Sequence, residues 1–73
     1  NENRREVLDA MLDLKNGGVE EVHPRDVCKY FSVSVTSKDG RRLSKTMQRM
    51  ANDFEIWKGQ KYGTYRLKQK INL

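Results

Sequence analysis

The spacing of the apolar residues changes once along this chain, and that change limits the folds open to it. From Val7 to Leu12, and again from Leu43 to Ala51, the apolar side chains recur three or four residues apart, as they do on one face of a helix. Beyond Ala51 they alternate, with Phe54 and Ile56 in one segment and Tyr65 and Leu67 in the next. Alternation puts every second side chain on the same face of a strand. The pattern therefore predicts helices followed by a β-hairpin, which is an α+β fold.

Two helices are predicted in the first part of the chain. The first covers residues 2–15 and ends at Asn16-Gly17-Gly18, because these residues tolerate the left-handed conformation that commonly ends helices. A short strand follows at residues 19–22. The second helix covers residues 24–31, since Pro24 suits the first helical position, where its missing N–H is no loss. Its predicted inward side chains are Val27, Cys28 and Phe31.

The next segment allows two interpretations. Val33 and Val35 alternate with serines, and Asp39-Gly40 is a favoured hairpin turn, so a second hairpin could form here. A third helix is the preferred interpretation, with a weak capping-box pattern at residues 36–39 just upstream. Its apolar residues stand at i, i+4, i+7 and i+8, the spacing of one helix face: Leu43, Met47, Met50 and Ala51.

The length of the chain indicates a single domain. A chain of 73 residues buries only roughly 60% of its unfolded surface, so its core is thin. One cysteine cannot form an internal disulfide, and with a single histidine it cannot supply the four ligands of a structural zinc site. We therefore predict one packed domain over residues 1–73, without metal or cofactor. Because the chain begins with Asn1, we expect it to be excised from a longer parent.

Several function classes are disfavoured by what the sequence lacks. It has no run of about 18 apolar residues and no basic head followed by an apolar stretch, so we expect no membrane partner and an intracellular location. It has no Gly-Lys phosphate-binding motif and no His-Glu-x-x-His motif. His23 is predicted to be a helix-entry residue and Cys28 a core residue. We predict that the domain is not an enzyme.

Basic residues are concentrated in the second half of the chain. Residues 1–37 carry five bases and seven acids (net −2), whereas residues 38–73 carry ten bases and three acids (net +7). Such asymmetry favours a nucleic acid or another polyanion as partner. On charge alone, a solvated basic face without a ligand is an equal alternative.

The predicted third helix separates an apolar face from a basic one. With about 100° between successive residues, Leu43, Met47 and Met50 fall on one side. The opposite side carries bases and amides, which are the side chains that read guanine and adenine in a major groove. The candidate DNA-binding residues of this helix are Arg41, Arg42, Lys45, Gln48, Arg49 and Asn52.

The order of predicted elements resembles the winged helix-turn-helix family. The resemblance rests on "HPRDVCKYF", "RRLSKTMQRMAND" and "FEIWKGQKYGTYRL" and extends over nearly the whole chain. One departure is the connection at residues 32–39, which is longer than the three or four residues of a tight helix-turn-helix. The resemblance implies double-stranded DNA as partner, with the third helix in the major groove and the hairpin, or wing, on the neighbouring backbone or minor groove.

The predicted wing is also basic. Gly59 and Gly63 allow its tip to approach a backbone closely. Trp57 falls on the strand face opposite Ile56, where a semi-buried structural role is favoured over a partner surface. Tyr62 could contact sugar or phosphate, or fold back over the hairpin. The candidate DNA-binding residues of the wing are Lys58, Lys61, Tyr62, Arg66 and Lys68.

Three kinds of partner remain open at this point. The first is double-stranded DNA, in a transcription regulator or a replication protein. The second is another protein subunit or the rest of the parent chain, because winged-helix folds also serve as docking units, and its signature would be an exposed apolar patch around Trp57 and Tyr62. The third is structured RNA.

Overall fold

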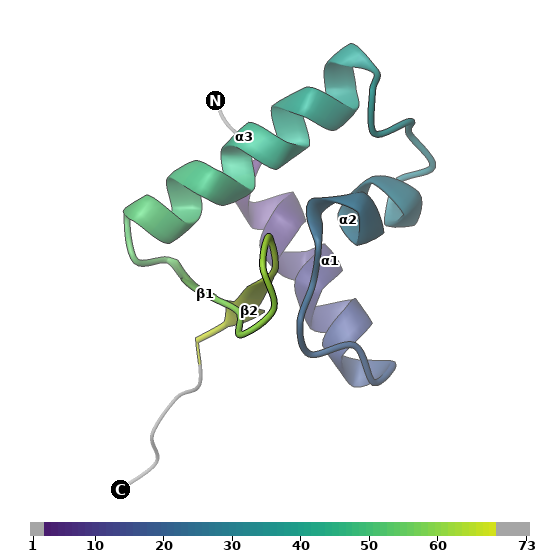
Figure 1. Ribbon diagram of the computed structural model, residues 1–73. Coiled ribbons are helices and arrows are strands. Elements are labelled where there is room, and N and C mark those ends of the chain that lie inside the picture. The colour runs from purple at the N-terminus through teal and green to yellow at the C-terminus, as the bar shows by residue number, and fades with distance from the viewer. Residues whose placement is uncertain (1–2, 69–73) are drawn as a thin grey trace, which may run out of the picture.

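Within the described part of the chain, three helices precede a two-stranded antiparallel sheet, so the predicted α+β class is confirmed. The structure, a computed structural model, describes residues 3–68. Figure 1 shows α3 lying across α1 and α2, with the hairpin below the end of α3. The elements are α1 (Arg4–Asn16), α2 (Pro24–Tyr30), α3 (Lys38–Asn52), β1 (Ile56–Lys58) and β2 (Tyr65–Leu67).

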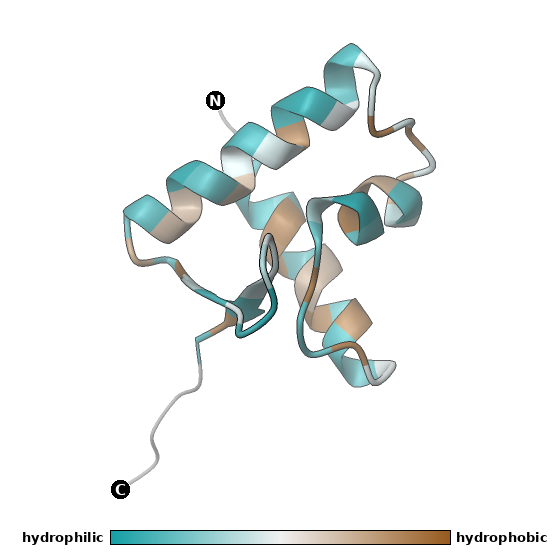
Figure 2. Ribbon diagram, in the orientation of Figure 1, coloured by the Kyte–Doolittle hydropathy of each residue, from teal (hydrophilic) through white to brown (hydrophobic). Residues whose placement is uncertain are grey.

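The core lies where the apolar faces of the helices meet the inner face of the hairpin. The predicted inward residues of α3 are all buried, and Met47 and Met50 are fully inaccessible. Figure 2 shows α3 as a mostly hydrophilic helix with hydrophobic segments interspersed, as expected for an element with one buried face. The buried apolar residues are Val7, Ala10, Met11, Val22, Val27, Cys28, Leu43, Met47, Met50, Ala51 and Ile56.

Side chains cap the starts of α2 and α3. His23 Nδ1 accepts a hydrogen bond from the backbone of Arg25 (3.0 Å), and Asp26 accepts one from the backbone of His23 (3.0 Å). In α3 the cap is Ser37, whose hydroxyl oxygen accepts from the Gly40 amide at 3.0 Å. The pattern predicted at residues 36–39 is therefore wrong by one position, and Gly40 lies in the helix rather than in a hairpin turn.

All three helices end in the same way, with a left-handed residue that lets the chain turn back. That residue is Gly18 after α1 (φ 101°), Ser32 after α2 (φ 59°) and Phe54 after α3 (φ 61°). In each case the following amide donates to a carbonyl in the last turn, which is the Schellman arrangement. The pairs are Val19 to Leu14 (2.8 Å), Val33 to Cys28 (2.9 Å) and Glu55 to Met50 (2.8 Å).

The position of Phe54 overturns one prediction. It was expected to point inward from a strand beside Ile56, but it lies in the turn before β1 and its side chain is 74% exposed. The helix runs to Asn52, so Phe54 falls at the left-handed position that reverses the chain. Ile56, in contrast, is buried as expected.

The hairpin pairs β1 with β2 and is also tied to the segment before α2. Ile56 lies opposite Leu67, and Trp57 lies opposite Arg66. The strand predicted at residues 19–22 forms only a single bridge, in which Val22 and Tyr65 exchange two hydrogen bonds of 2.8 Å. Because β2 is only three residues long, Tyr65 alone is paired on the side of β2 that faces away from β1.

No helix within residues 3–68 is long and apolar enough to cross a membrane.

Candidate nucleic-acid interface

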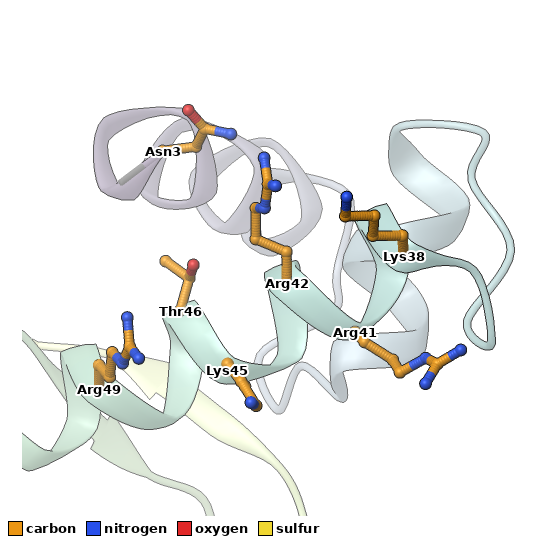
Figure 3. Close-up of a pocket in the computed structure, with 7 residues that line it drawn as sticks. All are labelled: Asn3, Lys38, Arg41, Arg42, Lys45, Thr46 and Arg49. Atoms are coloured by element: carbon orange, nitrogen blue, oxygen red, sulfur yellow. The ribbon is translucent and has the colours of Figure 1, made fainter. Parts of the chain in front are cut away.

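The exposed side of α3 is lined with cations. Five bases share it, all of them exposed, around a shallow hollow of about 460 Å³ that also includes Asn3 and Thr46. Figure 3 shows Arg42 and Thr46 on the side of α3 near Asn3, while Arg41 and Lys45 extend from another side of the helix. We call this surface the cationic face of α3; its residues are Lys38, Arg41, Arg42, Lys45 and Arg49.

Like charges recur along the cationic face at a spacing that destabilises a helix. Three pairs of like charge stand four residues apart, Lys38 with Arg42, Arg41 with Lys45, and Lys45 with Arg49. Each such pair destabilises a helix by about 0.2–0.5 kcal/mol. Bases in the first turn also oppose the positive end of the helix dipole. The charge pattern therefore favours an external anion as the source of the negative charge that balances these bases.

The structure places every residue predicted for this face in α3 with its side chain exposed. Arg41 and Arg42 lie within the helix rather than in the preceding loop, and Arg41 Nε donates to the Thr36 carbonyl (3.2 Å). Gln48 and Asn52 extend the exposed face toward the end of the helix. Their contact with DNA stays a prediction.

Three residues that line this hollow were missed by the sequence reasoning: Asn3, Lys38 and Thr46. Lys38 falls on the same side because the helix begins at that residue, and the Ser37 cap is the signal that would have found it. Asn3 lines the same hollow through the packing of α1 against α3, for which the sequence holds no local signal.

The hairpin presents a second set of the predicted residues. Lys58, Lys61 and Lys68 are exposed, and Tyr62 is completely exposed (102%), so its ring does not fold back over the hairpin. Arg66 is half-buried and pairs with Glu20 at 3.4 Å, which directs its charge toward the chain before α2. Exposed pairs of this kind contribute little, about 0–1 kcal/mol.

One carboxylate fixes the loop between the strands. Glu21 Oε1 accepts hydrogen bonds from the Lys61 amide (2.8 Å) and the Thr64 hydroxyl (3.2 Å). Gly59 allows this loop to close tightly, because a Cβ there would lie 2.2 Å from Thr64 Oγ1. Tyr62 thus lies in a loop whose conformation is fixed by hydrogen bonds to Glu21. No sequence pattern indicated Glu21, which is forty positions from Lys61.

Acid is expected to release this loop. The hydrogen bond from the Lys61 amide, with smaller contributions from Thr64 and Arg66, lowers the pKa of Glu21. A carboxyl whose pKa is lower in the folded state stabilises the loop above its unfolded pKa, about 4.3, and loses that contribution as pH falls through the folded value. The Lys61 amide resonance should therefore titrate below pH 4.3 in wild type and not in Glu21→Gln. An amide indifferent to pH between about 5 and 3 would show that Glu21 does not hold the loop.

Two acids lie beside the end of α3, and one arginine binds both. The Arg4 guanidinium contacts Asp53 at 2.9 Å and also contacts Glu55. Of the three acids in the basic half of the chain, these two therefore have a cation of their own. The contact reduces the repulsion that an approaching phosphate would meet at this end of the helix.

The single histidine and the single cysteine of the chain both have structural roles. His23 caps α2, and Cys28 is buried between α2 and α3, where its thiol donates weakly to the Gly40 carbonyl (3.7 Å). Burial raises the pKa of the Cys28 thiol, which disfavours a reactive thiolate. Within the described residues, no three His, Cys, Asp or Glu side chains are grouped so as to hold a metal ion.

No family model, curated protein or solved structure matches this chain.

Proposed function

We propose that the chain is a winged-helix domain that binds double-stranded DNA, with α3 in the major groove and the hairpin on the adjacent backbone or minor groove. It would act by binding rather than catalysis, within a transcription regulator or a replication protein. The observation that carries the proposal is the cationic face of α3, where five exposed bases gather on one helix and like charges stand four residues apart.

The dimensions of α3 support this use. From Lys38 to Arg49 the bases extend along about 17 Å of helix, at about 1.5 Å per residue. A major groove about 12 Å wide admits an α-helix. Gln48 and Asn52 are exposed along the same helix, and such amides can bond adenine edges.

The order of elements supports the winged-helix assignment. Helix, extended segment, helix, helix and hairpin follow one another as the resemblance requires, with the Val22 bridge at the place of the short strand. The connection between α2 and α3, residues 31–37, is longer than a tight helix-turn-helix turn. Its Ser34 and Val35 backbone packs against Gly40, so the extra length covers the start of α3.

Fluorescence anisotropy against duplex DNA, single-stranded DNA and RNA at two salt concentrations tests the proposal. Five to eight phosphate contacts predict a slope of about −5 to −7 for log K against log salt, at about −0.9 per contact. Duplex DNA should bind most tightly. Binding that is insensitive to salt would exclude the proposed DNA binding and would indicate a docking module for another protein. A preference for RNA would instead assign the cationic face of α3 to structured RNA.

A single substitution should separate binding from stability. Lys45→Ala removes two like-charge pairs from α3, so the free energy of unfolding should stay the same or rise by up to about 1 kcal/mol. The same change should weaken DNA binding and make the salt slope shallower by about 0.9. Lys29→Ala, an exposed base on α2, is the matched control and should leave the slope unchanged. Equal slopes for the two variants would contradict a role for the cationic face.

A further inference from the structure

Two aromatic side chains that the core does not use follow the end of α3, one in the turn before β1 and one in β1. Phe54 is 74% exposed and Trp57 is 45% exposed. Both line a hollow of about 420 Å³, which we call the aromatic hollow. Its residues are Ala51, Asn52, Phe54, Ile56, Trp57 and Lys58.

Phe54 occupies a backbone conformation that its side chain disfavours. Its φ of 61° is in the left-handed region, where glycine is the usual residue and a bulky residue is an outlier. The corresponding position after α1 is indeed a glycine, Gly18. An exposed aromatic ring held at such a position gains little from the fold, and strained residues of this kind cluster at ligand sites.

The aromatic hollow is continuous with the proposed DNA-binding surface. Asn52 belongs both to the exposed face of α3 and to the hollow, and Lys58 belongs both to the hairpin and to the hollow. Figure 1 shows this turn between the end of α3 and β1. A DNA strand that contacts both α3 and the hairpin would therefore pass the turn. The neighbouring acids Asp53 and Glu55 both contact Arg4, which lowers their repulsion of phosphate.

We propose that the aromatic hollow binds an unpaired nucleobase at the end of the duplex, so that the domain prefers a duplex with a single-stranded extension to a blunt one. Aromatic side chains stack on unpaired nucleobases of any sequence. A nearby basic side chain, such as that of Lys58, binds the backbone phosphate. This inference rests on the proposed DNA binding and adds the form of DNA that is preferred.

The test compares three versions of one duplex, at a single salt concentration. One is blunt, one carries a short adenine extension, and one carries an abasic extension with the same number of phosphates. Stacking of one base is worth about 1–3 kcal/mol, so the adenine extension should bind about 5- to 140-fold more tightly than the abasic one. Extensions at the 3′ and 5′ ends are measured separately, and the gain is expected at one or both.

The chain contains a single tryptophan, which gives the test a direct spectroscopic signal. Trp57 lies in the hollow, so its fluorescence should be quenched by the adenine extension and much less by the abasic or blunt duplex. Phe54→Gly removes one ring and relieves the left-handed strain, so its melting temperature should equal or exceed that of wild type. It should lose most of the gain from adenine and keep its affinity for the blunt duplex, whereas Phe54→Tyr should retain the gain.

Two results would overturn the inference, and they are distinguishable. Blunt duplex bound in a salt-dependent manner, with equal affinity for the adenine and abasic extensions, would remove the base site and leave the proposed DNA binding intact. Absence of binding to every duplex would remove both.

Discussion

Gly40→Ala is expected to destabilise the fold by about 3 kcal/mol, the upper end of the usual cost of overpacking, because the added methyl group has no space. A Cβ at this position would lie 2.1 Å from the Ser34 carbonyl oxygen and 2.8 Å from that of Val35. Both are backbone atoms, so relief requires the connection before α3 to move. A domain of 73 residues has a total stability of roughly 4–11 kcal/mol, at about 0.05–0.15 per residue. The loss would therefore unfold a considerable fraction of the molecules at modest urea concentrations.

Gly17→Ala is the matched control for this substitution. Its φ is −88°, and the nearest atom to an added Cβ is the Leu14 carbonyl oxygen at 3.5 Å, an ordinary contact. Its unfolding free energy should stay the same or rise by about 0.4–1 kcal/mol. Urea denaturation followed by circular dichroism measures both variants. A Gly40→Ala protein within about 1 kcal/mol of wild type would contradict the close packing of residues 34–35 against α3.

Met47→Ala is expected to cost about 2–5 kcal/mol of stability and to weaken DNA binding to the extent that the variant unfolds. Met47 is completely buried and stands on the face of α3 opposite its cations. Truncation removes apolar contacts and leaves a cavity that a thin core refills only in part. The free energy from urea denaturation, measured beside anisotropy with duplex DNA, gives both effects.

Two further variants make the Met47 result specific. Met47→Leu conserves volume and should lose less than about 1.5 kcal/mol. Gln48→Ala alters the exposed neighbour on the same helix and should change stability by no more than about 0.5 kcal/mol. If Met47→Ala were as stable as Gln48→Ala, the packing of α3 against the core would be wrong.

The helices could be predicted because their local signals agree with their packing. The apolar spacing of α3 predicted Leu43, Met47 and Met50 as buried, and all three are. Pro24 correctly marked the start of α2, and the two glycines marked the end of α1. Phe54 was misplaced because its alternation with Ile56 imitates a strand, whereas the fold needs a chain reversal there. Propensity alone does not put an aromatic residue at a left-handed position.

The candidate site could be predicted where it lies on a single helix and not where distant segments meet. The bases of α3 share a face because of helical spacing alone, which the sequence displays. The contacts of Arg4 with Asp53 and Glu55 join positions about fifty residues apart, and those of Glu21 join the segment before α2 to the hairpin loop. Such contacts depend on tertiary packing, for which no local pattern exists.

The double attachment of the hairpin affects how the molecule meets a partner. β2 pairs with β1 on one side and with Val22 on the other, and Glu21 accepts a hydrogen bond from the loop. The hairpin is therefore fixed relative to the helices. Helix and hairpin arrive as one preorganised surface, so little conformational entropy remains to be lost on association. Affinity would then be governed by how well a partner fits that fixed shape.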